Sequence, residues 1–174
     1  MLHTRRRLLL IYMEIFKIES HHYPQIAAIY LQGISSGNAT FQTEVPDWTD
    51  WDKSHLPHSR LAVFVNNDIA GWAALTPVSS RCVYAGVGEV SIYIADKYRG
   101  KGIGKALFSQ LIKDSEENGL WTLQSGIFPE NTASIKLHEA CGFRQIGYRE
   151  KIGKMNGIWR DNIILERRSK TAGI

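Results

Sequence analysis

The chain has 174 residues, of which 44% are hydrophobic, 22% charged and 10% aromatic. This length suits one domain with a sizeable core, and the composition excludes collagen-like, mainly disordered and disulfide-framework chains. The formal net charge is +4, and part of the excess lies near the two ends, at residues 5–7 and 167–170. Charge placed in tails is weak evidence for nucleic-acid binding, so we expect no nucleic-acid partner.

The first residues resemble an export signal only superficially, since a basic triplet precedes a short apolar run that ends at Ile11. Glu14 soon interrupts the apolar character, no small-residue cleavage site follows, and the run is far shorter than the ~20 residues that a bilayer requires. We interpret residues 1–12 as a non-core extension, 13–168 as one domain and 169–174 as a tail. A cytoplasmic protein without a membrane partner is expected.

Two cysteines, Cys82 and Cys141, belong to no CxxC pair and no cluster with zinc-ligand spacing. They suit a reducing cytosol, where each is most simply a small buried hydrophobe. The histidines at positions 21, 22, 55 and 58 lack metal-ligand spacing with acidic partners. We therefore expect no metal site.

The first half of the chain predicts a strand, two helices and three further strands. Alternation over 14–18 indicates a half-buried strand, and apolar residues at helical spacing indicate a helix over 23–33. A polar loop over 34–45 leads to a second helix from Pro46 to about Leu56, with proline in its first turn. Strands follow at 61–65, 69–75 and 89–94, the first two joined as a hairpin by the turn 66–68.

The second half continues with helices and strands in alternation. A glycine-rich loop over 99–104 opens a helix that ends near Asn118, before Gly119 as its C-terminal signal. The remaining elements are a strand over 120–128, a helix over 131–141, and strands over about 143–154 and 158–167 joined by Asn156-Gly157. The order β α α β β β α β α β β predicts a single α/β domain with a mixed, mostly antiparallel sheet flanked by helices.

The glycine-rich loop is the strongest chemical signal. Glycines at 100, 102 and 104 let the backbone turn sharply and approach a ligand, and the N-terminus of the following helix is a natural seat for a pyrophosphate. A Walker loop requires Gly-Lys-Ser/Thr after a longer spacing, and a dinucleotide fingerprint requires G-x-G-x-x-G, so both are excluded. A strand–helix turn that binds nothing remains the alternative on spacing alone.

Two motifs carry a resemblance to a known family. The run Arg99-Gly100-Lys101-Gly102-Ile103-Gly104 resembles the coenzyme A-binding signature of the GCN5-related N-acetyltransferase (GNAT) superfamily. The downstream signature of that superfamily is matched by Asn131, Ser134, His138 and Gly142-Phe143. The resemblance covers roughly residues 13–168 and implies the GNAT fold.

Within the superfamily the chain is similar to the phosphinothricin and methionine sulfoximine acetyltransferase branch. The similarity rests on the helix segment 26–30, on Glu89 heading the strand 90–94, on 137–139 before Gly142, and on 157–161. Members often carry two arginines before that strand. Only Arg81 matches here, beside Ser79 and Ser80. This difference leaves the particular substrate undetermined, but it does not change the reaction that the resemblance implies.

The resemblance implies acetyl-CoA as co-substrate. Its acyl-pantetheine arm is expected to pair with the main chain of Ile92, Tyr93 and Ile94 as an added strand. Asn131 is expected to bond the arm, and Ser134 to reach the arm or the phosphates. The pyrophosphate would lie on Arg99, Gly100, Lys101, Gly102, Ile103, Gly104 and Lys105.

Acetyl transfer to an amine requires a base for the amine, polarisation of the thioester carbonyl and departure of a thiolate. By resemblance Glu89 is the candidate base, its alternative being a solvated acid at a strand end. His138 stands where many members place the tyrosine that protonates the thiolate, its alternative being a packed helical histidine. Arg81 is a candidate clamp for a substrate carboxylate or phosphinate, against a plain surface arginine. With Glu89, the substrate is expected to contact Val90 and Ser91.

The aromatic residues Phe41, Trp48 and Trp51 either line a substrate pocket or pack beneath the connection between the first two helices. Trp159 beside Asp161 either closes the far side of the pocket or lies in a dimer interface, as that region does in relatives. A homodimer is expected only on that resemblance.

The predicted function is an N-acetyltransferase that transfers acetyl from acetyl-CoA to a small amino acid or analogue of the phosphinothricin, methionine sulfoximine or methionine sulfone type. Two alternatives stay open within the fold, an acetyltransferase for a peptide N-terminus and one for a polyamine. A more distant alternative is a non-catalytic acyl-CoA-binding regulatory domain.

Overall fold

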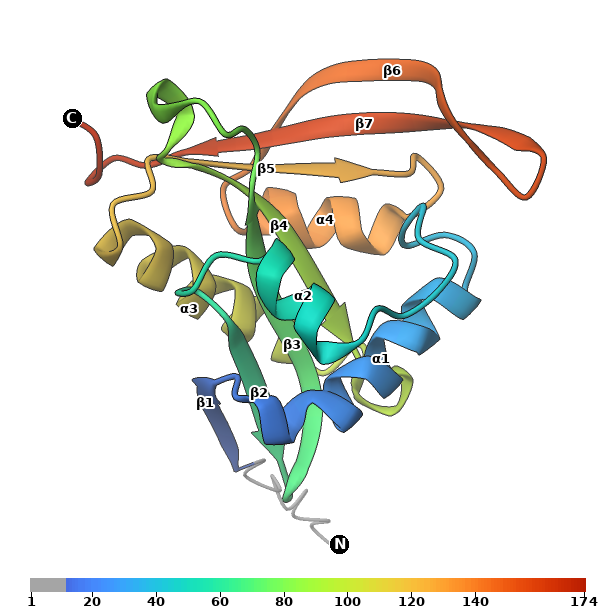
Figure 1. Ribbon diagram of the computed structural model, residues 1–174, viewed down its shortest axis with the longest axis vertical. Coiled ribbons are helices and arrows are strands. Elements are labelled where there is room, and N and C mark those ends of the chain that lie inside the picture. The colour runs from blue at the N-terminus through green and yellow to red at the C-terminus, as the bar shows by residue number, and fades with distance from the viewer. Residues whose placement is uncertain (1–11) are drawn as a thin grey trace, which may run out of the picture.

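The computed structural model describes residues 12–174, and Figure 1 shows their arrangement. The predicted extension therefore lies outside the described residues, apart from Tyr12. In the described part the strands form one seven-stranded sheet in the order β1-β2-β3-β4-β5-β7-β6. The strands are β1 Met13–Lys17, β2 Leu61–Val65, β3 Asp68–Pro77, β4 Val87–Ile94, β5 Thr122–Ile127, β6 Arg144–Met155 and β7 Ile158–Arg168.

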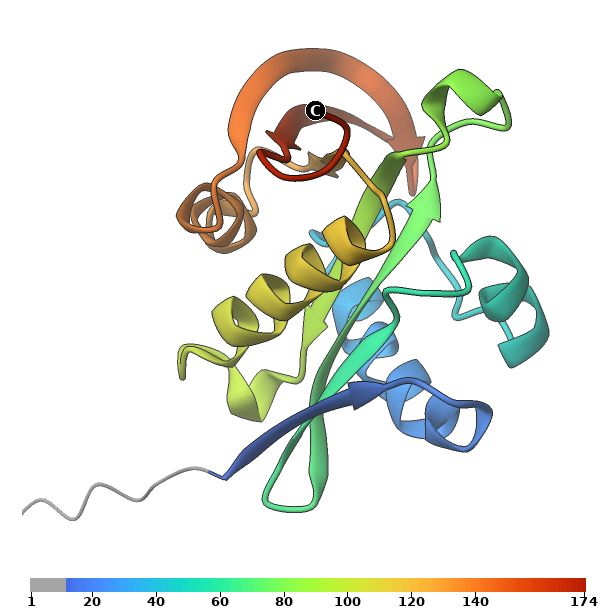
Figure 2. The ribbon, with the colours of Figure 1, turned by 90° about the vertical axis from the view of Figure 1, so that its left-hand side faces the viewer.

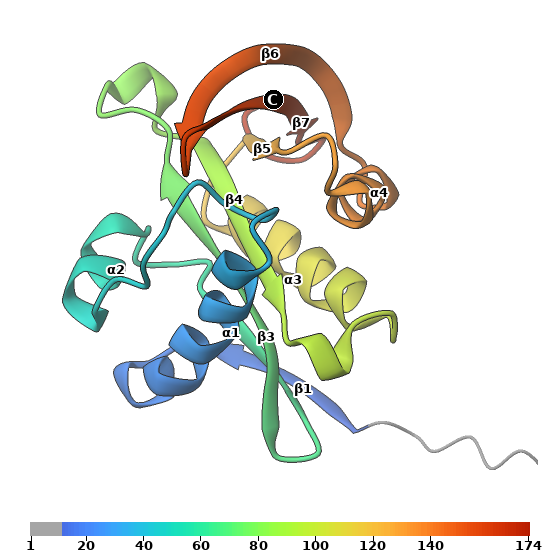
Figure 3. The same cartoon turned by 90° about the vertical axis from the view of Figure 1, so that its right-hand side faces the viewer.

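Helices cover both faces of this sheet. They are α1 Tyr23–Ser35, α2 Trp48–Ser54, α3 Ile103–Glu117 and α4 Thr132–Ala140. Views from two opposite sides place α1 and α2 on one face of the sheet and α3 and α4 on the other (Figure 2, Figure 3). The predicted α/β class, element order and mostly antiparallel sheet are confirmed. Within residues 12–174, no helix is both long and apolar enough to span a membrane.

The predicted second helix, over 46–56, is shorter in the structure. The Asp47 side chain caps α2 by accepting a hydrogen bond from the Asp50 amide at 2.9 Å, so the helix begins at Trp48. At the other end His55 is extended, and the buried Arg60 guanidinium donates to the carbonyl oxygens of Asp52 and His55. These bonds satisfy the last carbonyls of the helix and stop it there.

The core lies between β3 and the helices on either side. Trp72 and Leu75 of β3 are fully buried, and Leu107 and Leu111 of α3 are buried with them in one hydrophobic cluster. Burying a leucine side chain contributes about 1.5–3 kcal/mol. This packing fixes α3, and with it the loop that precedes α3, against the middle of the sheet.

The two central strands β4 and β5 are parallel but pair over only three residues. Their ladder joins Val87, Gly88 and Glu89 to residues 122–124, whereas β3 pairs with β4 from Gly88 to Ile94. Beyond Glu89, β5 turns away with β7, and Figure 1 shows β5 and β7 crossing the upper end of the sheet. The outer edge of residues 90–94 is therefore open among the described strands.

Candidate active site

A cleft of about 680 Å³ lies where β4 and β5 part. Its wall on one side is β4 and the glycine-rich loop, and on the other side β5, α4 and the segment between α1 and α2. The predicted site residues that line it are Glu89, Val90, Ser91, Ile92, Tyr93, Ile94, Arg99, Gly100, Gly102, Gly104, Lys105, Asn131, Ser134 and His138.

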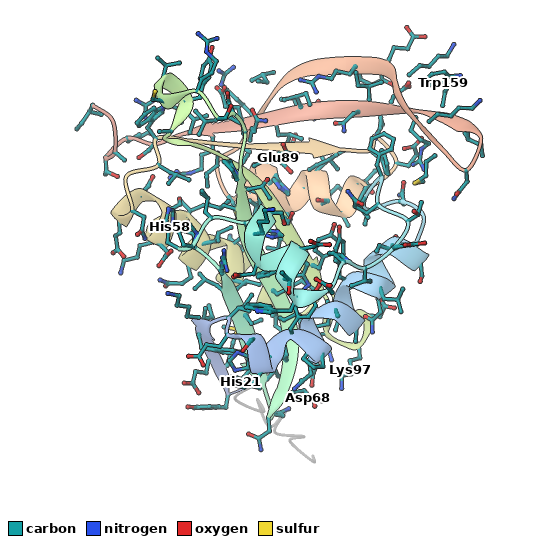
Figure 4. The ribbon with its side chains drawn as sticks, in the orientation of Figure 1. His21, His58, Asp68, Glu89, Lys97 and Trp159 are labelled. Carbon is teal, nitrogen blue, oxygen red and sulfur yellow. The ribbon has the colours of Figure 1, made fainter. Side chains whose placement is uncertain are left out.

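Glu89 lies at the junction of the two strands. It is the last residue of β4 that pairs with β5, opposite Gln124, and its side chain is exposed. The amide Nε2 of Gln124 lies 3.5 Å from Glu89 Oε2, at the limit of a hydrogen bond. Figure 4 places Glu89 on the upper part of β4 beside β5. A carboxylate at this point is accessible to a molecule that enters the open end of the strand pair.

The N-terminus of α3 faces the same cleft. Gly102 is the N-cap residue with φ 79°, and among the described residues no side chain caps the helix. Gly100 has φ 72°, and a Cβ at either glycine meets none of the described atoms within 4 Å. The first amides of α3 are thus free to bind an anion, as the sequence predicts.

The basic residues of the loop do not all face the cleft. Arg99 and Lys105 line it, and Arg99 forms an ion pair with Asp96 at 2.9 Å. Lys101 instead donates from Nζ to the Lys97 carbonyl at 2.8 Å and lies over the Tyr98 ring. Ile103 is buried in the core below the loop. In this arrangement the Lys101 side chain does not line the cleft, and Ile103 can contact a phosphate only through its main-chain amide at the start of α3.

Asn131 has a structural role in addition to its place in the cleft. Its Oδ1 accepts from the Ser134 amide at 3.2 Å and so caps α4. Its Nδ2 donates to the Asn38 carbonyl at 3.1 Å. One N–H of this amide is thus left to bond a molecule in the cleft.

His138 lines the cleft but is only 1% exposed. Its Nδ1 donates to the Ser134 carbonyl at 2.8 Å, so in the neutral ring Nε2 carries no proton, and Nε2 has no partner among residues 12–174. Burial lowers the pKa of His138 to about 4, and Phe108 and Phe143 pack edge-on against the ring. The expected proton-donor role finds no support in this geometry.

Arg81 lies outside the cleft. It is exposed in the loop between β3 and β4, beside the short 3₁₀ turn Cys82–Tyr84, and its guanidinium lies 5.6 Å from the centre of the Tyr84 ring. Within this chain the expected clamp for a substrate anion is therefore not in place. Cys82 in the same loop is exposed, which corrects the expectation that it is buried, whereas Cys141 is partly buried.

Several residues of the cleft were not predicted. Gly126 of β5 leaves room for Asn162 of β7, whose Oδ1 is buried and has no hydrogen-bond partner in the described part of the chain. Neighbours on the two walls are Gly33, Ser36, Asn38, Ala39, Thr40, Tyr98, Ser125, Ile127, Phe128, Ala133 and Leu137. Most of these carry no local chemical signal, because only the pairing of distant strands brings them together.

The aromatic residues divide between the two interpretations. Phe41 lines the cleft and packs edge-on against Phe128 with ring centres 4.7 Å apart. Trp51 is fully buried and stacks with Trp48, so these two pack in the core. Trp159 is 56% exposed and Figure 4 places it near the far end of the β6–β7 hairpin.

Of the described histidines outside the cleft, His21 and His22 lie in contact, with ring centres 3.8 Å apart, and far from His58. Figure 4 shows His21 at the foot of the sheet and His58 near α3. Among residues 12–174, no group of three His, Cys, Asp or Glu side chains has the arrangement of a metal site.

Comparison with known proteins adds three kinds of similarity. The family model described as Acetyltransferase (GNAT) family matches residues 15–143. Phosphinothricin N-acetyltransferase of Alcaligenes faecalis is 32% identical over 152 residues, covering 83% of this chain and 76% of that protein. The L-methionine sulfoximine/L-methionine sulfone acetyltransferase of Pseudomonas paraeruginosa is 37% identical over 144 residues, covering 79% and 84%.

Solved structures agree in fold. A GNAT superfamily phosphinothricin acetyltransferase from Sinorhizobium meliloti, solved in complex with AcCoA, is 25% identical with a TM-score of 0.81, covering 92% of this chain and 90% of that one. A ribosomal-protein-alanine N-acetyltransferase from Brucella melitensis is 25% identical with a TM-score of 0.82, covering 90% and 99%.

Proposed function

The chain belongs to the GNAT family of acetyltransferases, and on that premise we propose that it transfers acetyl from acetyl-CoA to the amino group of a small amino acid or analogue. The observation that carries the proposal is the open edge of β4 directly beside Glu89. An extended arm adds to such an edge as a further strand, through main-chain hydrogen bonds.

The cleft offers binding groups for two parts of acetyl-CoA, the pantetheine arm and the pyrophosphate. The outer edge of residues 92–94 is not paired with β5 and is open to the arm, apart from the Ile94 carbonyl, which accepts from Arg99 Nε at 3.2 Å. The uncapped start of α3 presents amides to the pyrophosphate, with Arg99 and Lys105 beside it. Asn131 keeps one N–H for the arm, and Ser134 lies one turn along α4. Acetyl-CoA supplies a thioester carbonyl carbon that an amine attacks.

Glu89 is the proposed base. An acceptor amine is an ammonium ion at neutral pH and must lose a proton before it can attack. A carboxylate at the junction of β4 and β5 attracts the ammonium, orients it toward the arm on residues 90–94, and accepts that proton directly or through water. The Gln124 amide lies beside it, with Nε2 3.5 Å from Oε2.

His138 has no proton to donate in this proposal. Its Nε2 is an unprotonated acceptor at neutral pH, so the thiolate leaves without protonation by this ring. Thiols ionise near pH 8.5, so a thiolate is a tolerable leaving group that takes its proton from solvent. His138 instead packs α4 against Phe108 and Phe143.

The substrate class rests on the relatives, which act on phosphinothricin, methionine sulfoximine or methionine sulfone by name. The Brucella structure supports a peptide N-terminus as the second candidate. Arg81 is outside the cleft of this chain, so the group that binds a substrate carboxylate is part of what the experiment must identify.

The test is a screen for amine-dependent thiol release. Purified protein and acetyl-CoA are incubated with a thiol reagent and with methionine sulfoximine, methionine sulfone, phosphinothricin, common amino acids, a polyamine and an alanyl peptide. Release with the first three and not with the peptide or polyamine supports the proposal. Thiol release with the peptide alone would replace the proposed substrate class by a peptide N-terminus. If none of these amines causes thiol release, the proposed function is overturned.

The proposal includes a cytoplasmic homodimer. Large apolar residues are exposed along the β6–β7 hairpin, namely Ile146, Tyr148, Ile152, Ile158 and Trp159. Such a patch is typical of a protein interface. Sedimentation of the purified protein distinguishes a dimer from a monomer.

A further inference from the structure

Arg160 of β7 lies outside the cleft and holds the segment that forms one of its walls. Its Nη1 donates to the Gly37 carbonyl at 2.9 Å, and its Nη2 donates to Asn38 Oδ1 at 2.9 Å. Nη2 also lies 3.3 Å from Glu130 Oε2, and the guanidinium lies 4.0 Å from the centre of the Phe128 ring. The side chain is only 16% exposed, so these bonds are partly shielded from water.

Asn38 connects this arginine to α4. Its side chain accepts from Arg160, and its carbonyl accepts from Nδ2 of Asn131 at 3.1 Å. The segment 37–41 is therefore attached to two elements more than 90 residues further along the chain. A planar guanidinium that bonds two different acceptors fixes the direction of the segment, which a lysine ammonium does less well.

The segment continues from this attachment into the cleft. Asn38, Thr40 and Phe41 line the cleft, and Phe41 packs against Phe128. On its other side Phe41 fits over Gly153 of β6, where a Cβ would lie 2.8 Å from the ring. The wall of the cleft is thus built on the β6–β7 hairpin, with Arg160 as its polar attachment.

The position of the segment relates it to the acceptor. The glycine-rich loop and Asn131 belong to α3 and α4, on one face of the sheet, whereas residues 37–41 arrive from the face that α1 and α2 cover (Figure 3). An arm on the α3–α4 side leaves the α1–α2 side of Glu89 for the amine. We propose that Arg160 is a positioning residue that holds residues 37–41 as the wall of the acceptor pocket and so sets which amines are accepted.

This inference rests on the proposed function for its kinetic part. The Arg160→Met variant removes the guanidinium that bonds Gly37 and Asn38. Arg149→Met is the matched control, because it removes the same charge at an exposed position on the neighbouring strand β6. Each variant is assayed with acetyl-CoA on the best acceptor of the screen and on trialanine as a bulkier amine. Thermal unfolding and acetyl-CoA affinity show that each variant is folded.

For Arg160→Met we expect KM for the acceptor to rise about tenfold, with KM for acetyl-CoA within about twofold of wild type. The preference for the small acceptor over trialanine falls by a similar factor, Arg160→Lys restores part of it, and Arg149→Met changes neither. A parallel rise in both KM values, or unchanged acceptor preference in a folded Arg160→Met protein, would overturn the inference.

Amide hydrogen exchange separates this failure from failure of the proposed function. Loss of the Arg160 guanidinium should speed hydrogen exchange at the amides of residues 37–41 about tenfold relative to wild type and Arg149→Met. This readout needs no activity. A wild-type protein without amine-dependent thiol release refutes the proposed function, whereas unchanged exchange at 37–41 refutes the role of Arg160.

Discussion

Glu89 occupies the last position at which β4 pairs with β5, and the cleft opens directly beyond it. Its exposure leaves the carboxylate free to meet an ammonium group, and the neighbouring Gln124 gives it an N–H contact. The side chain therefore combines access from solvent with a position at the mouth of the cleft.

The Glu89→Gln variant keeps the shape and removes the base. Its kcat should fall about 10²–10⁴-fold with little change in acetyl-CoA affinity, because general base catalysis typically contributes that much. Glu117→Gln, an exposed change on α3, is the matched control and should retain full activity. A Glu89→Gln enzyme as fast as wild type at saturating amine would contradict the assignment.

His138 predicts a pH dependence of stability. Its pKa is about 4 in the folded protein and about 6.5 when unfolded, so between these values the unfolded chain binds a proton that the folded chain does not. The folded state should lose about 3 kcal/mol from this residue as pH falls from 7 to 4.

Urea unfolding of wild type and His138→Gln across that pH range measures this loss. The variant should be less stable at pH 7 yet show a flatter decline toward pH 4, and the control His21→Gln, at an exposed position, should follow wild type. Parallel declines in all three proteins would show that the His138 ring titrates normally in the folded state.

Site residues that belong to a local sequence motif were predictable from the sequence, whereas residues that act through distant contacts were not. Glu89 and Asn131 stand in local patterns, and the structure brings both to the cleft. Arg81 and Arg160 are the instructive contrast, because Arg81 matched a pattern and lies outside. Arg160, which bonds residues more than 120 positions away, was noted only as part of a similarity.

At the scale of elements, the opening between β4 and β5 depends on how β5 begins. The Gly86 carbonyl accepts from the amides of Trp121 and Thr122, at 2.8 and 3.1 Å, and so joins the two strands at their base. A Cβ at Gly86 would overlap the Trp121 ring. The glycine is thus needed for close approach at the point from which the strands diverge.

The Gly86→Ala variant should be destabilised by roughly 1–3 kcal/mol, since the ring and the start of β5 must shift. Gly147→Ala on β6 is the matched control, because a Cβ there meets none of the described atoms within 4 Å. Thermal and urea unfolding compare the two. Equal stabilities would show that Trp121 moves aside without cost.

Local signals predicted these elements well. Asn156-Gly157 forms the expected turn, with φ values of 50° and 80°, and joins β6 to β7. The parting of β4 from β5 was not predictable, because nothing in either strand's own sequence marks where their pairing ends, and its length depends on β7, some forty residues after β5. The open edge is a product of topology rather than of any motif.

At the scale of the whole molecule, the structure shows which basic residues of the glycine-rich loop line the cleft and which do not. The net charge of +4 was assigned partly to the tails and partly to three basic residues around the glycine-rich loop. Arg99 and Lys105 do line the cleft, whereas Lys101 bonds the Lys97 carbonyl outside it. Only part of the loop's charge therefore faces the cleft.

This division predicts unequal effects of two similar changes. Lys105→Met should raise KM for acetyl-CoA about fivefold, since an exposed charge near a phosphate contributes at most on the order of 1 kcal/mol. Lys101→Met should change it less than twofold. The Lys105 effect should shrink in 0.5 M salt, and equal effects of the two changes would contradict the placement of these side chains.

The central claim is that the open edge of β4 and the start of α3 together hold acetyl-CoA. Amide hydrogen exchange of the wild-type protein with and without acetyl-CoA tests it directly. We predict slower exchange on binding at the amides of residues 90–94 that β3 does not bond, and at the first amides of α3. Unchanged exchange at both places, with acetyl-CoA demonstrably bound, would contradict it.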